Sequence, residues 1–211
     1  MPVRAVLFDL GGVVFDSPFA GIGEVESRHG VRLGVVNEVI ARTGSGGAWA
    51  RNERGELDPS GFEAAFDEEL RDAGLPIRTG ELMAAIHDAF RERPAMLEAI
   101  DRIRAAGLRV AAVTNNWVQA SGGTLGEDVR SHFDVFIESA VVGMHKPDPA
   151  IYELALSELQ VDADEAVFLD DIGRNLKSAA ALGITTIKVV SEEQALGDLE
   201  ALLGFGLRGE Q

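Results

Sequence analysis

Two short apolar runs in this sequence end in carboxylates, which could bind a cation or attack an electrophile. Residues 5–8 are apolar and precede Asp9 and two glycines, and a later apolar run ends in Asp170 and Asp171. A carboxylate in such a position can bind Mg²⁺, act as a nucleophile, or do both. It can also merely cap the following turn. Either motif alone therefore leaves both interpretations open.

A lysine and two hydrogen-bond donors complete the set of residues that could do chemistry. Lys146 stands in a loop between Gly143 and two prolines. It could neutralise clustered carboxylates, hold a phosphate as a point charge, or be an ordinary exposed lysine. Thr114 and Asn115 end another apolar run, and their side chains can donate to phosphoryl oxygens or form an ordinary turn. The chemistry depends on whether these motifs meet in space.

Alternating strands and helices would bring the motifs together. Short apolar runs bounded by glycine predict buried parallel strands, and the amphipathic stretches between them predict helices. The predicted strands cover residues 5–8, 108–114, 135–138, 166–169 and 185–190. The helices predicted between and after them cover residues 94–106, 124–132, 149–159, 174–182 and 191–203. Because ligands bind at the carboxyl ends of such strands, we expect the motifs to converge at one edge of the sheet.

The segment between the first two predicted strands has a different pattern. Residues 15–93 show helical periodicity and no convincing strand. Asp58 and Pro59 are typical of an N-cap and a first helical residue. Further helices are expected at residues 22–29, 35–42, 49–54 and 82–91. We predict an α/β fold with a Rossmann-like parallel sheet, in which residues 1–14 and 94–211 form the core and residues 15–93 form a small helical cap inserted after the first strand.

Composition narrows the possible partners. The 211 residues carry a formal net charge of −16 and contain no cysteine. The acidity argues against nucleic acid, whose phosphates need a basic footprint, and the lack of cysteine excludes disulfides and thiolate chemistry. No apolar run approaches the roughly 20 residues of a membrane span, and the chain enters a strand too early for a signal peptide. We expect a cytoplasmic monomer or homodimer that acts on a small molecule, with no nucleic-acid or membrane partner.

Taken together, the four motifs resemble those of the haloacid dehalogenase-like superfamily of aspartate-nucleophile hydrolases. In order, they begin at Asp9, Val113, Lys146 and Leu169. Within that superfamily, the second half of the chain resembles the N-terminal phosphatase domain of bifunctional soluble epoxide hydrolases. The stretches that carry this likeness are residues 114–117, 132–139, 143–152 and 167–177. The chain is also similar to the phosphatase-like domain fused to some acyl-CoA dehydrogenases, and the resemblance covers the core well and the cap poorly.

The resemblance implies a role for each motif residue. Asp9 is expected to be the nucleophile, and Mg²⁺ is expected on Asp9, the backbone carbonyl of Gly11, and Asp171. Asp170 is expected to support the metal site and to pair with Lys146. The catalytic set implied is Asp9, Lys146 and Asp170. The substrate-binding set implied is Thr114, Asn115 and Lys146.

Gly11 departs from the pattern of the superfamily's phosphatases. These usually carry a second aspartate two positions after the nucleophile, as general acid and then base, and such help is typically worth roughly 10²–10⁴-fold in rate. We therefore expect a Mg²⁺-dependent phosphatase of a small phosphorylated metabolite, working through an aspartyl-phosphate. It would be slow, prefer good leaving groups, or borrow an acid from the cap, where Asp16 and His29 are candidates by position in the sequence.

Two other functions remain open at this stage. Gly11 fits a degenerate member that binds phosphate or a partner protein without catalysis. It also fits a metal-independent haloacid dehalogenase, although the dehalogenases of the superfamily lack the acidic pair found at Asp170 and Asp171. Further side chains could contact substrate or have ordinary packing and surface roles, namely Trp49, Arg51, His87, Trp117 and His145.

Overall fold

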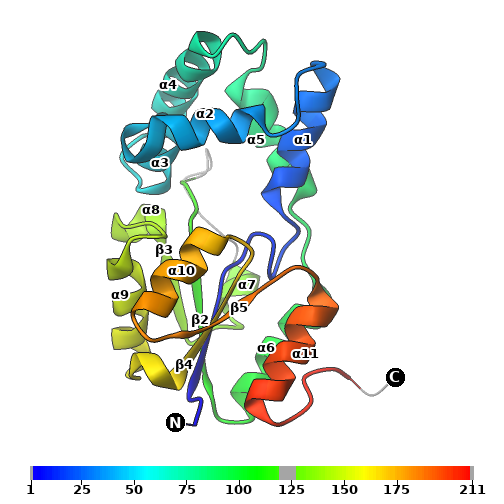
Figure 1. The fold of residues 1–211 in the computed structure, drawn as a ribbon, viewed down its shortest axis with the longest axis vertical. Helices are drawn as coiled ribbons and strands as arrows, with labels where there is room; N and C mark the ends of the chain where they lie inside the picture. The colour runs from blue at the N-terminus through cyan, green and yellow to red at the C-terminus, as the bar shows by residue number, and fades with distance from the viewer. Residues whose placement is uncertain (1, 119–126, 210–211) are drawn as a thin grey trace.

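A central parallel sheet organises the fold of this chain, whose computed structural model describes residues 2–118 and 127–209. The strands are β1 (Ala5–Phe8), β2 (Arg109–Thr114), β3 (Val135–Glu138), β4 (Ala166–Asp170) and β5 (Thr185–Lys188). Among the described residues these five strands form one sheet in the order β3-β2-β1-β4-β5, with parallel pairing throughout. The predicted α/β fold with a parallel sheet is confirmed, and β1 lies at its centre (Figure 1).

The register of the strands sets which residues meet at the end of the sheet. Phe8 of β1 pairs with Ala112 of β2 and with Leu169 of β4. Asp9 and Asp170 each follow their paired residue by one position, and the Asp9 amide donates to the Leu169 carbonyl at 2.9 Å. The two carboxylates therefore emerge side by side at the carboxyl end of neighbouring strands.

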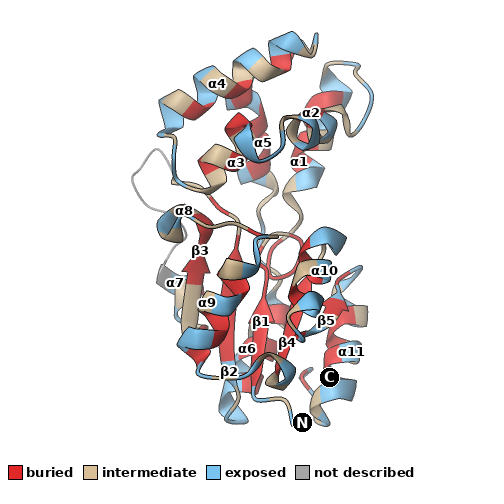
Figure 2. Cartoon of the chain, turned by 60° about the vertical axis from the view of Figure 1, so that its left-hand side comes forward, coloured by how far each residue is buried: buried red, intermediate tan, exposed pale blue. Residues whose placement is uncertain are grey.

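Helices cover both faces of the sheet. They are α6 (Pro94–Ala105) and α11 (Glu192–Leu203) on one face, and α9 (Pro149–Leu159) and α10 (Gly173–Ala181) on the other. Successive strand residues point to opposite faces, so Val6 and Phe8 pack with the first pair of helices while Ala5 and Leu7 pack with the second. Figure 2 shows the resulting buried strands between more exposed helices.

Short helices complete the core. They are α7 (Glu127–Arg130), α8 (Ser139–Val142) and the 3₁₀ turn η2 (Ala163–Glu165). The helix predicted over residues 124–132 is represented by α7, and residues 124–126 lie outside the described residues. The predicted start at Asp148 is confirmed, because its side chain accepts from the Ala150 amide at 3.0 Å and Pro149 opens α9.

The cap consists of helices that pack around their own apolar cluster above the sheet (Figure 1). They are α1 (Pro18–Arg28), α2 (Val35–Thr43), η1 (Gly44–Gly46), α3 (Ala48–Glu53), α4 (Pro59–Asp72) and α5 (Thr79–Ala89). Asp58 caps α4 by accepting from the Gly61 amide at 2.7 Å, as predicted. α1 begins earlier than predicted because Ser17 and Pro18 act as N-cap and first helical residue. None of the helices in the described parts combines the length and apolar character that a membrane span requires.

The chain enters and leaves the cap along two adjacent segments. The Asp16 amide donates to the Arg91 carbonyl at 2.8 Å, and the Arg93 amide donates to the Val14 carbonyl at 2.9 Å. Phe15 and Phe90 stack beside them with ring centroids 4.2 Å apart. These contacts hold the cap over the carboxyl end of the sheet, where the polar motifs lie.

Candidate active site

Asp9 and Lys146 form the centre of a buried ion-pair network. Asp9 is 7% exposed, and its Oδ1 lies 2.8 Å from Lys146 Nζ. Lys146 is 1% exposed, and the same ammonium donates to Asp170 Oδ2 at 2.9 Å. One cation thus bridges the carboxylates that end β1 and β4. Lys146 is therefore not an ordinary exposed lysine.

Asp170 is oriented by donors on its own side of the site. It is fully buried, and Asn175 Nδ2 lies 3.2 Å from its Oδ1 and 3.0 Å from its Oδ2. The Ile172 amide also donates to Oδ1 at 2.6 Å. With Lys146 on Oδ2, the Asp170 carboxylate is saturated by protein donors. It is therefore better suited to positioning its neighbours than to binding substrate.

Asp171 completes a cluster of three acids. One ligand atom from each of Asp9, Asp170 and Asp171 can be chosen so that all lie within 4.8 Å of one another. Lys146 supplies one positive charge against these three carboxylates, so the cluster holds excess negative charge. Carboxylate oxygens are the ligands that Mg²⁺ prefers, and this donor set fits a divalent cation between β1 and β4.

The acidities of the cluster reflect that crowding. Burial raises the pKa of Asp9 to about 8, with Lys146 acting to lower it and Asp170 to raise it further. Burial and the neighbouring Asp170 also raise the pKa of Asp171. Burial alone would lower the pKa of Lys146, but Asp170 and Asp9 outweigh it and raise that pKa. The lysine is therefore charged, and another cation nearby would favour ionised aspartates.

Two glycines give the turn after β1 its close approach to the acids. Gly12 has φ +79°, and a Cβ at this position would come 2.3 Å from Asp171 Oδ2. Both the positive φ and the close approach of Asp171 exclude a side chain at position 12. Gly11 has more room, since a Cβ would meet Pro18 Cδ at 3.3 Å. Arg93 Nη1 holds the turn from the cap side by donating to the Gly12 carbonyl at 2.8 Å.

Thr114 and Asn115 lie at the end of β2, as predicted, but the Asn115 side chain is already engaged. Its Oδ1 accepts from the Lys146 amide at 2.8 Å, and its Nδ2 donates to the Lys146 carbonyl at 3.0 Å and to Glu53 Oε2 at 3.1 Å. Thr114 is buried, and its hydroxyl lies 3.4 Å from the Asn115 carbonyl. Asn115 thus fixes the lysine loop and links the core to the cap.

A cleft of about 540 Å³ opens between these core residues and the cap. We call it the acid-lined cleft. Asp9, Lys146 and Asp171 line it from the core, and Trp49 and Glu53 line it from α3. Gly11 and Trp117 line it as well. Asp9, Asn115, Lys146 and Asp171 therefore face one shared cavity, which is closed on the far side by the cap.

A second cavity of about 480 Å³ adjoins the first. We call it the apolar pocket, because its wall is mainly carbon. Both cavities share lining residues, namely Gly11, Pro18, Asn115 and Trp117. Phe62, Met83, Ile86 and Phe90 are among the other residues that line the apolar pocket. His87, a candidate from the sequence, lies in its wall rather than in the acid-lined cleft.

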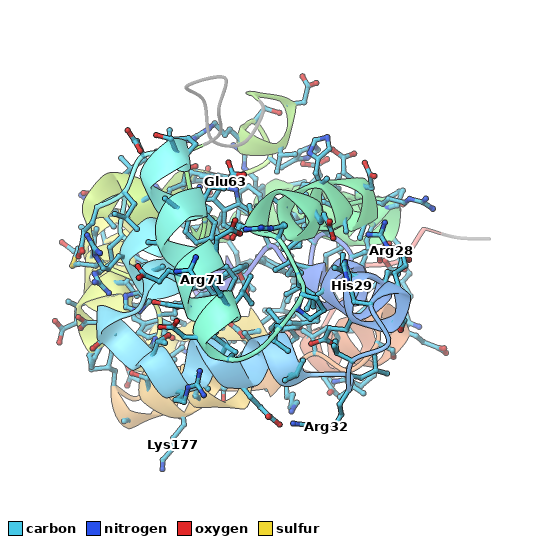
Figure 3. The ribbon with its side chains drawn as sticks, turned by 90° about the horizontal axis from the view of Figure 1, so that it is seen from above. Arg28, His29, Arg32, Glu63, Arg71 and Lys177 are labelled. Atoms are coloured by element: carbon cyan, nitrogen blue, oxygen red, sulfur yellow. The ribbon has the colours of Figure 1, made fainter. Side chains whose placement is uncertain are left out.

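Three candidates that the sequence suggested in the cap are engaged elsewhere: Asp16 and His29 as proton donors, and Arg51 as a substrate contact. Asp16 Oδ1 lies 3.3 Å from Arg93 Nε, and His29 Nε2 lies 2.7 Å from Glu81 Oε2 within the cap. Figure 3, which views the molecule from the cap side, shows His29 beside Arg28 at the end of α1. Arg51 pairs with Glu56 at 3.4 Å. None of these side chains is part of the wall of the acid-lined cleft as described.

Sequence reasoning missed three polar residues at the site. Asn175 orients Asp170. It stands five residues after Asp170, in the first turn of the following helix, and this spacing could have identified it. Arg174 lines the acid-lined cleft beside it. Glu53 also lines the cleft, but it stands in a charged stretch of the cap with no distinguishing pattern. Only the hydrogen bond from Asn115, directly after β2, to Glu53 reveals its position.

Comparison with known proteins places these features in a family. A family model described as haloacid dehalogenase-like hydrolase matches residues 3–183. Mouse acyl-CoA dehydrogenase family member 10 is 40% identical over 97% of this chain and 19% of its own length. Bifunctional epoxide hydrolase 2 of Sus scrofa is 35% identical over 98% of this chain and 40% of its own length. The chain thus spans well under half the length of these relatives, in agreement with the resemblance to single domains of such proteins.

Two further comparisons cover whole proteins of similar size. A sesquiterpene phosphatase of Aspergillus oryzae is 26% identical over 95% of this chain and 97% of its own length. A solved structure of a haloacid dehalogenase family enzyme from Bacteroides thetaiotaomicron, in complex with magnesium and inorganic phosphate, matches with a TM-score of 0.59 at 20% identity. That match covers 88% of this chain and 93% of the other. The likeness in fold therefore covers both the core and the cap.

Proposed function

Because this chain belongs to the haloacid dehalogenase-like hydrolase family, we propose that it is a Mg²⁺-dependent phosphatase that forms an aspartyl-phosphate on Asp9. The observation that carries the proposal is the meeting of Asp9, Asp170 and Asp171 around one buried lysine. Phosphoryl transfer needs little more than an in-line nucleophile, a cation and fixed donors. The cluster supplies the nucleophile and one fixed donor, the Lys146 ammonium, and its excess negative charge supports a divalent cation.

The proposed roles follow from the positions of the side chains. Asp9 attacks the phosphorus atom and takes the phosphoryl group, and water later releases inorganic phosphate from it. Lys146 keeps Asp9 oriented and contributes positive charge, while Asp170 and Asn175 hold the lysine in place. When bound, Mg²⁺ would neutralise charge on the phosphoryl oxygens, and we propose Asp9, Asp171 and the Gly11 carbonyl as its protein ligands. We propose that Thr114, at the end of β2, and Asn115, directly after it, donate hydrogen bonds to the phosphoryl oxygens.

The apolar pocket supports a leaving group with a hydrocarbon body. It shares Gly11 and Asn115 with the acid-lined cleft, so an alcohol attached to a phosphoryl group at Asp9 could extend into it. A carbon-lined wall favours apolar over charged groups. A relative of similar length is described as a sesquiterpene phosphatase, which is consistent with this substrate class. We propose a small phosphate monoester whose alcohol is largely apolar.

Release of inorganic phosphate tests the proposal. Purified protein is incubated with p-nitrophenyl phosphate, hexyl phosphate and glycerol phosphate, with Mg²⁺ or with EDTA, and halide release from 2-chloropropionate is measured in parallel. We expect phosphate release that requires Mg²⁺ and that is faster for hexyl than for glycerol phosphate. Halide release without Mg²⁺, or no product from any of these compounds, would refute the proposal.

A further inference from the structure

The missing acid at Gly11 leaves the proposed reaction without a proton donor for the leaving group. A carboxylate from the cap faces the same cleft. Glu53 is the last residue of α3, and it lines the acid-lined cleft together with Asp9, Lys146 and Asp171. Glu53 lines the cleft from the cap, whereas Asp9 lines it from the core. The leaving group of an ester attacked by Asp9 points away from the nucleophile, which is toward the cap.

Hydrogen bonds hold the Glu53 carboxyl in a defined position. Trp49 Nε1 donates to Oε1 at 3.0 Å, and Asn115 Nδ2 donates to Oε2 at 3.1 Å. Asn115 also binds both the amide and the carbonyl of Lys146. The Asn115 side chain therefore connects Glu53 to the loop that carries Lys146, whose ammonium contacts Asp9. A phosphoryl group that takes over the Asn115 donor would release Oε2 beside the reacting ester.

The surroundings of Glu53 favour its protonated form near neutral pH. Burial raises the pKa of Glu53 to about 7, although the Trp49 hydrogen bond, Arg174, Lys146 and the Asn115 hydrogen bond each act to lower it. The charged groups that act on it are thus Lys146 from the loop after α8 and Arg174 from α10. A phosphate dianion in the cleft would raise this pKa further, because like charges disfavour ionisation. An acid with a pKa near the working pH is well matched to proton transfer.

We propose that Glu53 is a catalytic residue that donates a proton to the leaving group and then acts as the base for water, in place of the aspartate absent at position 11. This inference depends on the proposed phosphatase function. In the first step, the Asp9–phosphorus bond forms, the bond from phosphorus to the leaving oxygen breaks, and the Glu53 proton moves to that oxygen to give the free alcohol. In the second step, Glu53 takes a proton from a water molecule while the oxygen of that water bonds to phosphorus. The Asp9–phosphorus bond breaks, giving inorganic phosphate and restoring both side chains.

The dependence on leaving group tests this role. Aryl phosphates leave without protonation, whereas alkyl phosphates need a proton. We expect Glu53→Gln to lower kcat/KM for hexyl phosphate by about 10²–10⁴-fold and for p-nitrophenyl phosphate by less than about tenfold. Adding Gly11→Asp to Glu53→Gln should recover hexyl phosphate turnover. The matched control is Glu56→Gln, an exposed glutamate in the segment directly after α3 that pairs with Arg54, and it should behave like wild type.

Tryptophan fluorescence gives a second readout that needs no turnover. The chain has two tryptophans, and Trp49 donates directly to Glu53. We expect the emission of wild type and Glu56→Gln to change with a midpoint near pH 7 and that of Glu53→Gln to lack this transition. A missing transition in wild type would overturn the role, and so would equal losses on both esters in Glu53→Gln or unchanged hexyl phosphate turnover. If wild type releases no phosphate from any ester, the proposed phosphatase function fails, and the role of Glu53 fails with it.

Discussion

Lys146 Nζ lies 2.8 Å from Asp9 Oδ1, inside a site where both residues are almost completely buried. A buried ion pair of this kind is costly to break, since removing one partner leaves the other charge uncompensated. Asp170 and Asp171 increase the cost here, because they lie beside Asp9. The lysine therefore stabilises the fold as well as the proposed chemistry.

Replacing this lysine should weaken both stability and activity. We expect Lys146→Met to lower the free energy of unfolding by about 3–5 kcal/mol and to abolish phosphate release, as measured by urea denaturation and a phosphate assay. Lys177→Met is the matched control, because Lys177 is exposed on α10 and projects from the surface in Figure 3. A loss below about 1 kcal/mol in Lys146→Met would contradict a compensating role for the ammonium.

Removal of the divalent cation should destabilise the protein. A ligand that binds only the native state adds about 2.7 kcal/mol when its concentration is 100 times Kd, so Mg²⁺ should raise Tm relative to EDTA. Asp171→Asn should lose most of that increase, because it removes a proposed ligand. Asp101→Asn, on an exposed residue that bonds His132, should retain it. An equal Mg²⁺ effect on Tm in Asp171→Asn and wild type would place the cation elsewhere.

The two glycines after Asp9 should respond differently to substitution. Gly11→Asp needs Pro18 to give by a few tenths of an ångström, and it would add an acid where the family's phosphatases usually carry one. In the Glu53→Gln background, we expect it to raise hexyl phosphate turnover relative to Gly11→Ala, which adds bulk without an acid. Gly12→Ala should abolish activity, because its Cβ would collide with Asp171 Oδ2 and its φ is +79°. In that background, an acid at position 11 that leaves turnover at or below that of Gly11→Ala would argue against the need for a proton donor to the leaving group.

His145 should make stability depend on pH. Burial lowers its pKa below the ordinary value of 6.5, and Arg54 and Arg174 act in the same direction. The folded state then binds fewer protons than the unfolded state below about pH 6.5, so stability decreases as the pH falls through that value. We expect His145→Gln to show a smaller drop in Tm between pH 7.5 and pH 5.5 than wild type. An unchanged drop would mean that other groups control this pH range.

The polar ends of the strands could be predicted from the sequence because strand ends in a parallel sheet share one edge. Apolar runs and glycines mark β1, β2 and β4, and the acids, threonine and asparagine end these strands or follow them directly. Glu53 could not be found this way. Its role depends on where the cap places the end of α3, and no local pattern encodes the hydrogen bond between Glu53 and Asn115. The same holds for the apolar pocket, which is built from helices distant in sequence.

The most direct test of the central claim is to identify which residue carries a phosphate group during turnover. Protein mixed with p-nitrophenyl phosphate and Mg²⁺ is quenched in acid, digested and examined by mass spectrometry. We expect a phosphate group on the peptide that contains Asp9, and no such label in Asp9→Asn or in EDTA. Phosphate release with the label on another residue, or with no labelled peptide at all, would contradict an aspartyl-phosphate on Asp9.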